Sequence, residues 1–285
     1  MRLDLLLVKA RKCVRKMRGG AQAHLIESDG GDHYVVKFAN NPQGRRILVN
    51  EFVSSLLLGE LGIAVPQPAV VAIDEEFLRS NPEVCLSLGN EQIAVRPGVH
   101  YGSQYAVSCV GSPIYDFLPD SMLSEVFNRN HFLGALVADK WLANGDGRQA
   151  VFYRARIMGL SPAPSPVRWV AQMIDHGHAF QGSGWTFRDS PIQGLHARRV
   201  VYGSDPSIRD FAPWIDALMR VSRDFLDKVF LLIPPDWIAG EELEFLRVLR
   251  RLYQRRERVP QLLAESIDHL TKSNLAQPRE SRCSS

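Results

Sequence analysis

Cysteine is scarce in this chain, and the four cysteines present are far apart. Cys13, Cys85, Cys109 and Cys283 form no Cys-x-x-Cys pair within the 285 residues. This spacing argues against a disulfide scaffold and against a structural zinc site built from thiolates. Because such usage is compatible with a reducing compartment, we expect a cytoplasmic location.

The chain also lacks a long apolar run. Its amino-terminal stretch, Met1-Arg-Leu-Asp-Leu-Leu-Leu-Val, is too short for a secretory signal, and basic residues follow it where a signal would place them first. No other uncharged stretch reaches the length that spans a bilayer. We therefore expect no association with a membrane.

An excess of charge of one sign is absent as well. The 34 Lys and Arg residues against 31 Asp and Glu residues leave a formal net charge of +3. This near balance gives no support to a nucleic-acid-binding protein. The arginines of the run from Arg250 to Arg258 alternate with apolar positions at helical spacing, which favours a solvated helix face. A basic helix that binds nucleic acid is the alternative.

Two short polar turns, each holding one carboxylate, are the most informative feature that is present. Asp146 lies in Trp141-Leu-Ala-Asn-Gly-Asp-Gly, and Asp175 directly follows the predicted strand Trp169–Ile174. Acids at the ends of two adjacent elements suit phosphoryl transfer, in which one orients the nucleophile and the other holds magnesium. Asn-Gly-Asp-Gly is also ordinary turn chemistry, so the pair alone is not diagnostic.

A glycine-rich turn and a lysine strand precede these acids. Glycines at Gly19 and Gly20 would let backbone amides approach a phosphate closely. Lys37 lies between apolar neighbours in the predicted strand Tyr34–Phe38, so we expect its ammonium to face a cleft or an interface. A hairpin with an isolated lysine is the alternative interpretation of this segment.

A glutamate follows on a predicted amphipathic helix. The apolar residues of Leu48–Leu61 recur at spacings of three and four, and Gly62 with Pro66 closes the helix. Glu51 lies at the edge of the apolar stripe, where a buried cation would be its partner. A pair with Lys37 would satisfy both groups, whereas a solvated acid in the first turn is the alternative.

Taken in order, these segments resemble the HipA-type serine/threonine kinases and their HipA-like relatives. The resemblance runs from about Arg18 to Phe180. Its anchors are Gly20-Ala21-Gln22, Val36-Lys37-Phe38, Asn50-Glu51, Leu61-Gly-Ile-Ala-Val-Pro66, Asp146-Gly147 and Ile174-Asp175. The resemblance implies an α+β, two-lobed protein-kinase-like fold, with a small β-rich amino-terminal lobe and a larger, mainly helical carboxyl-terminal lobe. It also implies ATP and Mg²⁺ as cofactors.

The resemblance further implies a role for each matching residue. The phosphates of ATP would be covered by Gly19, Gly20, Ala21 and Gln22. Lys37 would contact the phosphates, and Glu51 would steady Lys37. Asp146 would accept or orient the proton of the acceptor hydroxyl, and Asp175 would bind Mg²⁺. The implied reaction is transfer of the ATP γ-phosphate to a protein serine or threonine, with a small-molecule alcohol as the other possible acceptor.

One departure from the family pattern bears on activity. HipA-type enzymes carry a metal-binding asparagine five residues after the catalytic aspartate, and Val151 occupies that position here. Valine coordinates no metal, so Gln149, Asn144 or water would have to supply the missing oxygen. The alternative function is therefore a weak or inactive pseudokinase that binds ATP or acts as a scaffold.

Three further polar residues stand close to the two acids. Arg148 could clamp a phosphate or pair with a carboxylate inside the lobe, and we favour the internal pair. His176 and His178 flank Asp175, but no third nitrogen or sulfur ligand lies nearby in the sequence. A zinc site is therefore not expected.

The predicted organisation has an amino-terminal lobe over 1–97, a carboxyl-terminal lobe over 98–272 and a disordered tail over 273–285. The first lobe would end with a strand at Gln92–Arg96 and a hinge at Pro97-Gly98. The segment 181–203 is irregular and occupies the place of an activation segment that could move over substrate.

The predicted elements of the second lobe begin with a helix from Ser121 to Leu142 that leads to Asp146. A strand pair, Val151–Tyr153 with Trp169–Ile174, would support the two acids. Three helices would follow, at Ser207–Leu232, Glu241–Tyr253 and Val259–Thr271.

Overall fold

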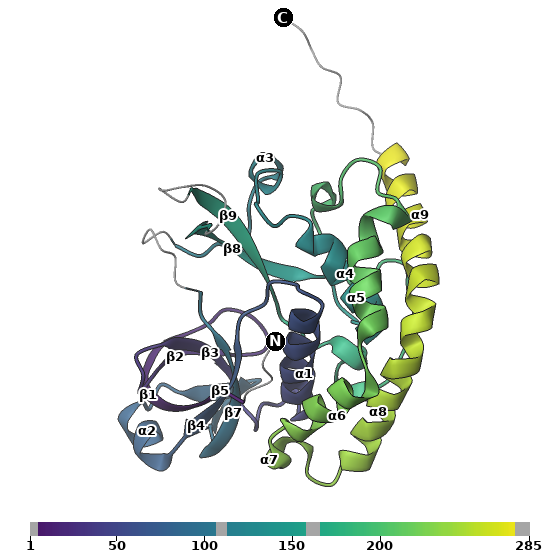
Figure 1. Ribbon diagram of the computed structural model, residues 1–285. Coiled ribbons are helices and arrows are strands. Elements are labelled where there is room, and N and C mark those ends of the chain that lie inside the picture. Colours follow the sequence, from purple (N-terminus) through teal and green to yellow (C-terminus); the bar gives the residue numbers. More distant parts are fainter. Residues whose placement is uncertain (1–4, 107–112, 158–165, 277–285) are drawn as a thin grey trace, which may run out of the picture.

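The computed structural model describes residues 5–106, 113–157 and 166–276. Strands dominate its amino-terminal part and helices its carboxyl-terminal part (Figure 1). The strands are β1 Leu7–Lys16, β2 His24–Ser28, β3 His33–Lys37, β4 Pro68–Ile73, β5 Cys85–Leu88, β6 Glu91–Ala94, β7 Gly98–Gln104, β8 Gln149–Arg156 and β9 Val167–Ile174. The α+β class predicted from the sequence is therefore confirmed.

The helices concentrate after the barrel strands. They are α1 Arg46–Glu60, α2 Glu75–Ser80, α3 Asp120–Leu123, α4 His131–Leu142, α5 Ala212–Arg220, α6 Arg223–Leu231, α7 Pro235–Ile238, α8 Glu242–Arg255 and α9 Val259–Ala276. Short 3₁₀ turns lie at Ala179–Gly184, Arg199–Tyr202, Ile208–Phe211 and Arg256–Arg258. Among the described helices, none is both long enough and apolar enough to cross a membrane.

Five strands close into a barrel in the order β1-β2-β3-β7-β4, with β1 parallel to β4 and the other pairs antiparallel. Period-two alternation explains how β3 fits this barrel. Tyr34 and Val36 are buried in the barrel core, whereas Val35 and Lys37 point to the opposite face. The strand predicted around Lys37 therefore exists, and the alternation aims its ammonium away from the barrel interior.

The predicted hinge at Pro97-Gly98 is wrong. These residues lead into β7, which pairs with both β3 and β4 inside the barrel. The segment predicted as the last strand of the lobe, Gln92–Arg96, overlaps β6, which pairs with β5 in a hairpin outside the barrel. Because β7 continues to Gln104, we propose that the amino-terminal lobe extends to about residue 105 instead of 97.

Helix α1 begins two residues before the predicted start and ends one residue earlier. At its end, Gly62 has a φ of 76°, a left-handed conformation that favours glycine, and its N–H donates to the carbonyl of Gly59 (3.0 Å). This exit turns the chain toward Pro66 and β4. The apolar stripe of α1 packs mainly into the core of the helical part, which includes residues of α4, α8 and α9.

The predicted helix Ser121–Leu142 is two helices with an irregular segment between them. Within that segment the Asn128 side chain forms two hydrogen bonds with the backbone of Ala171 (2.8 and 2.9 Å), and the Phe127 N–H donates to the carbonyl of Trp169 (2.8 Å). These bonds attach the segment to β9. The backbone therefore follows the strand instead of continuing the helix.

The long helix predicted over Ser207–Leu232 is likewise divided, into a 3₁₀ turn, α5 and α6. Ser222 caps α6 by accepting a hydrogen bond from the Phe225 N–H (3.0 Å). Helices α8 and α9 confirm the other two predictions. Helix α9 continues through Ala276, so the predicted tail at 273–285 begins too early, and residues 277–285 lie outside the described part.

Candidate active site

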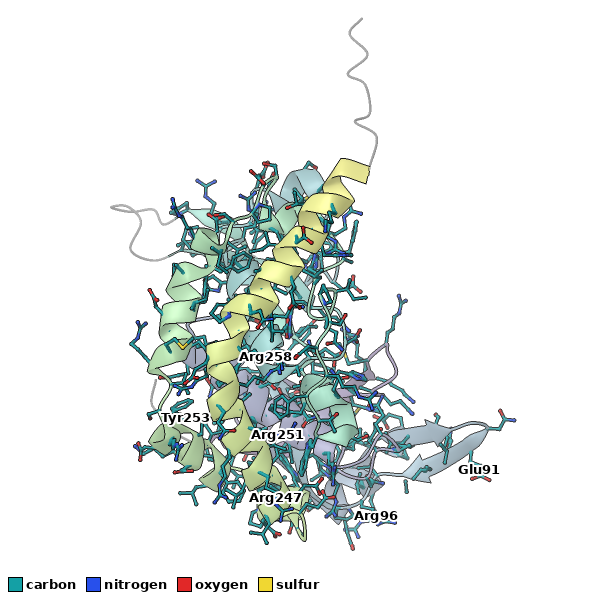
Figure 2. All side chains as sticks on the ribbon, turned by 90° about the vertical axis from the view of Figure 1, so that its right-hand side faces the viewer. Glu91, Arg96, Arg247, Arg251, Tyr253 and Arg258 are labelled. Atoms are coloured by element: carbon teal, nitrogen blue, oxygen red, sulfur yellow. The ribbon has the colours of Figure 1, made fainter. Side chains whose placement is uncertain are left out.

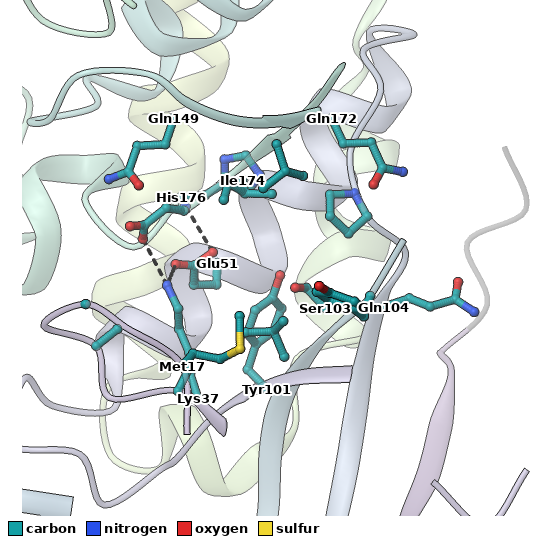
Figure 3. Close-up of a pocket in the computed structure, with 18 of the residues that line it drawn as sticks. Met17, Lys37, Glu51, Tyr101, Ser103, Gln104, Gln149, Gln172, Ile174 and His176 are labelled. Carbon is teal, nitrogen blue, oxygen red and sulfur yellow. Dashed lines mark hydrogen bonds and ion pairs between the residues drawn. The ribbon is translucent and has the colours of Figure 1, made fainter. Parts of the chain in front are cut away.

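A cavity of about 310 Å³ lies between the barrel and the β8–β9 ribbon (Figure 3). Its lining includes Val35 and Lys37 of β3, Tyr101 and Ser103 of β7, Gln149 and Val151 of β8, and Gln172 and Ile174 of β9. These residues are two positions apart in each strand, so one face of each strand forms a wall, and Gln104 at the end of β7 adds to the lining. Gly19, Gly20 and Ala21 also line the cavity.

The strand register gives this cavity two different ends. Lys37 pairs with Tyr101 and Gln149 pairs with Ile174, next to Asp175, at the charged end. Two residues further along, Val35 pairs with Ser103 and Val151 pairs with Gln172. Figure 3 shows Lys37 and Glu51 on one side of the cavity and Gln172, Ser103 and Gln104 on the other.

Lys37 is the centre of the charged end. Its ammonium donates to Glu51 Oε1 and to Asp175 Oδ1, the second at 2.9 Å. The Lys37 and Glu51 side chains are 12% and 2% exposed, so the pair is largely buried. Removal of either partner would leave a buried charge without compensation, which costs stability. The pair inferred from the sequence between Lys37 and Glu51 is present in the structure.

Opposite charges in contact determine the protonation of this cluster. Burial lowers the pKa of the Lys37 ammonium, but the charges of Glu51 and Asp175 outweigh burial and raise this pKa above its ordinary value. Burial raises the pKa of the Asp175 carboxyl, but Lys37 outweighs it, and the pKa is about 2. Lys37 is therefore a cation and Asp175 an anion at neutral pH.

Helix α1 fixes the segment that carries Asp175. Glu51 Oε2 accepts a hydrogen bond from the His176 N–H (2.9 Å). Asn50, fully buried, donates to the carbonyls of Gly177, Ala179 and Gly182 at 2.8 to 2.9 Å. Asp175 itself has a φ of 58°, an uncommon conformation for a residue other than glycine. Contacts from α1 thus hold the Asp-x-Gly turn in a conformation that the local sequence does not favour.

Arg148 forms the internal pair that the sequence analysis favoured. Its guanidinium donates to both carboxylate oxygens of Asp139, with Nε at 2.9 Å from Oδ2, and also to the carbonyl of Ile174 (3.0 Å). Nη1 lies 2.9 Å from His176 Nδ1. Burial and the Arg148 charge lower the pKa of His176 well below its ordinary value, so the imidazole is neutral and Nδ1 accepts. Arg148 therefore braces β9 next to Asp175.

Two predicted residues of the catalytic loop do not line the cavity. The Asp146 side chain is exposed and accepts a hydrogen bond from the Gly147 N–H (2.7 Å). Asn144 is buried, with Nδ2 donating to Asp139 (3.0 Å) and Oδ1 accepting from the Asp146 N–H (3.3 Å). Gly145 N–H donates to the carbonyl of His178 (2.9 Å), so the loop adjoins the segment that follows Asp175.

Gln22 also does not line the cavity. Its side-chain amide pairs with the backbone of Ser87, donating to the carbonyl (2.7 Å) and accepting from the N–H (2.6 Å). Since Ser87 belongs to β5, Gln22 fastens the glycine-rich turn to the β5–β6 hairpin. Gly19, Gly20 and Ala21 line the cavity, and their role in covering phosphates stays a prediction.

Gln172 is a cavity residue that the sequence analysis missed. A signal was available, because it is the one polar residue in the last five residues of β9, Val170–Ile174, and shares a face with Ile174 by alternation. Among the described residues, no group of three or more His, Cys, Asp and Glu side chains is arranged to hold a metal ion. Any metal at the charged end would therefore rely on Asp175 with amide, phosphate or water oxygens.

The basic run at the end of α8 is engaged within the protein. Arg251 and Arg255 lie over the Phe187 ring, with Cζ 5.0 and 5.3 Å from its centroid. Arg255 also contacts Asp189, and Arg258 pairs with the same carboxylate at 3.1 Å. Figure 2 shows Arg247, Arg251 and Arg258 spread along this side of the molecule. Arginines at 255 and 258 therefore anchor the 181–203 segment.

Comparison with known proteins identifies kinases. A family model described as "HipA-like kinase" matches residues 11–257. A Helicobacter pylori proinflammatory kinase, CtkA, aligns at 14% identity and a TM-score of 0.46, covering 93% of this chain and 96% of that chain. The Golgi casein kinase aligns at 12% identity and a TM-score of 0.50, covering 95% of this chain and 76% of that chain. A second structure of the Golgi casein kinase, described as having Mn/ADP bound, aligns at 13% identity and a TM-score of 0.50. It covers 95% of this chain and 76% of that chain. No curated protein matches the chain.

Proposed function

Because the chain belongs to the HipA-like kinase family, we propose that it transfers the γ-phosphate of ATP to a hydroxyl group. The observation that carries the proposal is the contact of Lys37 with both Glu51 and Asp175 at one end of a 310 Å³ cavity. Phosphoryl transfer needs positioning and positive charge around a developing anion more than covalent chemistry from the protein. A buried, permanently charged ammonium beside a metal-ligating carboxylate meets that need.

Each cavity residue then has a definite task. The backbone at Gly19, Gly20 and Ala21 covers the phosphates, and Lys37 attracts them while Glu51 holds its ammonium in position. The ionised Asp175 carboxylate suits Mg²⁺, which prefers oxygen ligands and supplies neutralisation of the phosphate charge when bound. The Golgi casein kinase structure with Mn/ADP bound supports the use of a nucleotide with a divalent metal.

The second protein ligand for the metal is proposed to be Gln149. Val151 cannot coordinate a metal, and the Asn144 side chain already bonds within its own loop. Gln149 lines the cavity and pairs with Ile174, which directly precedes Asp175. Its amide oxygen is thus the closest replacement along β8 for the asparagine that the family carries.

Asp146 is proposed to act as the base. The acceptor hydroxyl oxygen forms a bond to the γ-phosphorus, the bond from that phosphorus to the bridging oxygen of ADP breaks, and the hydroxyl proton passes to the Asp146 carboxylate. The exposed position of Asp146 gives a large acceptor access to it. A protein serine or threonine is the proposed acceptor because the family uses one, and a small-molecule alcohol is the alternative.

Transfer of labelled γ-phosphate by the purified protein tests this function. We expect Mg²⁺-dependent labelling of the protein itself or of a mixed protein substrate, and a rise in melting temperature with Mg²⁺ and ATP. Asp175→Asn should remove the labelling and remain folded, whereas Asp236→Asn, at an exposed aspartate that does not line the cavity, should retain it. Wild-type protein that neither binds ATP nor transfers phosphate would contradict the proposal.

The second candidate function is an ATP-binding pseudokinase, favoured by Val151 and by the absence of Asp146 from the cavity lining. This function predicts binding of ATP without transfer or hydrolysis. Val151→Asn separates the two candidates, since an added oxygen ligand should create metal-dependent turnover in a pseudokinase. Val151→Leu is the matched control, because it changes size without adding a ligand.

A further inference from the structure

The end of the cavity opposite Lys37 contains a buried hydrogen-bond acceptor that has nothing to accept. Gln172 lines the cavity, and its Oε1 is buried from solvent with no hydrogen-bond partner among the described residues. A buried polar atom in this condition costs free energy, and in native proteins it needs an explanation such as a bound ligand. The position of Gln172 in the cavity indicates which part of a ligand it would meet.

The distance from Gln172 to the charged end is similar to the distance between the base and the phosphates of a nucleotide. Three residues of strand separate it from Asp175, which corresponds to roughly 10 Å at about 3.3 Å per residue. Across the cavity at this end lie Val35 and Ser103, while Val151 pairs with Gln172 on the ribbon. Val35 from the barrel and Val151 from the ribbon thus bound a slot with an apolar side chain on each wall, which suits a flat ring, and Gln172 lies at this end of the cavity (Figure 3).

The backbone next to this slot is already partly occupied. The Gln104 N–H donates to the carbonyl of Gln67 (2.9 Å), and the Tyr105 N–H donates to the carbonyl of His33 (2.7 Å). These two donors are therefore not available to a base where the chain leaves the barrel. Gln104 also lines the cavity at this end. A hydrogen-bond donor for a ring nitrogen of a base would therefore have to come from a side chain of the lining.

We propose that Gln172 is a specificity-determining residue that reads the 6-amino group of a purine nucleotide. Its Oε1 accepts a hydrogen bond from that amino group, which satisfies the buried oxygen. Glutamine is suited to this task, since the same amide can donate from Nε2 to a ring nitrogen beside the amino group. The inference rests on the proposed function, because it requires the nucleotide phosphates at the Lys37 end.

The test compares ATP with purine riboside triphosphate, which has hydrogen in place of the 6-amino group. Binding of each to the wild-type protein is measured by calorimetry with Mg²⁺. We expect ATP to bind about tenfold more tightly, as for the loss of one hydrogen bond that leaves a buried partner unsatisfied. In Gln172→Leu the two affinities should become equal, while Gln92→Leu, at an exposed glutamine that does not line the cavity, should keep the tenfold preference.

The outcomes separate this inference from the proposed function. Wild-type protein that binds neither nucleotide would overturn the proposed function and the inference with it. Equal affinity of wild-type protein for both nucleotides would overturn the inference alone, and this measurement needs no variant to fold. A preference for ATP that persists in Gln172→Leu would assign recognition of the amino group to another residue.

Discussion

At the scale of single residues, the charged end of the cavity depends on one cation shared by two carboxylates. Lys37 contacts Glu51, which is almost fully buried, and Asp175, which is 31% exposed. A buried carboxylate without its cation is far more costly than a partly exposed one. The two acids therefore contribute unequally, with Glu51 governing stability and Asp175 remaining accessible for binding.

Replacement of Lys37 by Met should destabilise the protein, because it leaves Glu51 buried without a cation. Breaking a buried pair in this way typically costs about 3–5 kcal/mol. The double variant Lys37→Met/Glu51→Gln should recover part of that loss, since Gln can still accept from the His176 N–H. Denaturant unfolding of both variants measures the difference. Equal stability of the single and double variants would contradict the assigned pairing.

The lowered pKa of Asp175 predicts a specific response to acid. Since its pKa is about 2 in the folded protein and near 4 when unfolded, its ion pair contributes stability above the unfolded pKa. That contribution is lost progressively as the pH falls from the unfolded pKa through the folded one. Between pH 5 and pH 3 the wild type should lose about 1 kcal/mol more than Asp175→Asn. Parallel pH profiles of the two unfolding free energies would exclude this contribution.

At the scale of elements, the hairpin β5–β6 is connected to the glycine-rich turn. It projects from the barrel, with Glu91 near its tip in Figure 2. Gln22 joins it to the glycine-rich turn through Ser87, and Asn40 joins it to the chain after β3 through the carbonyl of Ala94 (2.9 Å). The hairpin therefore orders two segments that flank the cavity.

Gln22→Ala should weaken nucleotide binding without much effect on folding. The two bonds to Ser87 are exposed, so their loss should cost about 1 kcal/mol or less of stability. A less ordered glycine-rich turn should raise the dissociation constant for ATP several-fold. Gln92→Ala, an exposed glutamine on the same hairpin, is the control and should leave affinity unchanged. Isothermal titration measures the affinity of both variants for ATP. Equal affinities would show that the bond between Gln22 and the hairpin does not contribute to nucleotide binding.

The segment 181–203 is also more firmly held than its irregular sequence predicted. Lys140, buried in α4, donates to the carbonyls of Ser190 (2.7 Å), Pro191 (3.0 Å) and Gln193 (2.7 Å). Arg255 holds the neighbouring Asp189. Three charge-assisted bonds to consecutive stretches of backbone leave little freedom for this part to move over substrate.

Lys140→Met should release that anchor locally. The three carbonyls lose their donor, so amide exchange in residues 188–195 should accelerate while α4 stays protected. Hydrogen exchange followed by mass spectrometry resolves the two regions, and Lys228→Met, an exposed lysine on α6, is the control. Unchanged exchange at 188–195 would mean that Arg255 alone holds the segment.

At the scale of the whole molecule, two cores divide the protein differently from the two predicted lobes. The barrel has its own core, which includes Tyr34, Val36 and Phe38, whereas most buried residues of α1 belong to the larger core of the helical part. Arg46 of α1 strengthens this link, with Nη2 at 2.7 Å from both Glu241 and Glu244. Figure 1 shows α1 between the barrel and the helices. Glu51 is therefore held by the helical part while Lys37 is held by the barrel.

This division predicts how the protein unfolds. Native-state hydrogen exchange in low denaturant should show α1 losing protection together with α4, because both are buried in the same core. The barrel strands β2 and β3 form the comparison set. If α1 exchanged with those strands while α4 remained protected, α1 would belong to the barrel unit instead.

Several features of the protein could be predicted from sequence alone because they depend on local pattern. The β-rich run around Lys37 and helical spacing around Glu51 identified β3 and α1, and the mostly apolar segment before Asp175 identified β9. Ser222, a residue type that often caps helices, marked the break between α5 and α6 in the sequence. The apolar spacing continues on both sides of Ser222, so one long helix was predicted instead. These elements carry Lys37, Glu51 and Asp175, so the sequence alone predicted on which element each of the three charged residues lies.

Only the tertiary structure decided which side chains meet. Strand β7 was missed because its pairing with β3 and β4 depends on residues far away in sequence, and the same pairing extends the barrel to Gln104. The bond of Gln22 to Ser87 and the burial of Asn144 beside Asp139 arise from loop geometry that spacing does not encode. Sequence determined the elements because backbone preferences are local. The structure determined the cavity, since long-range packing selects which faces of those elements are opposed.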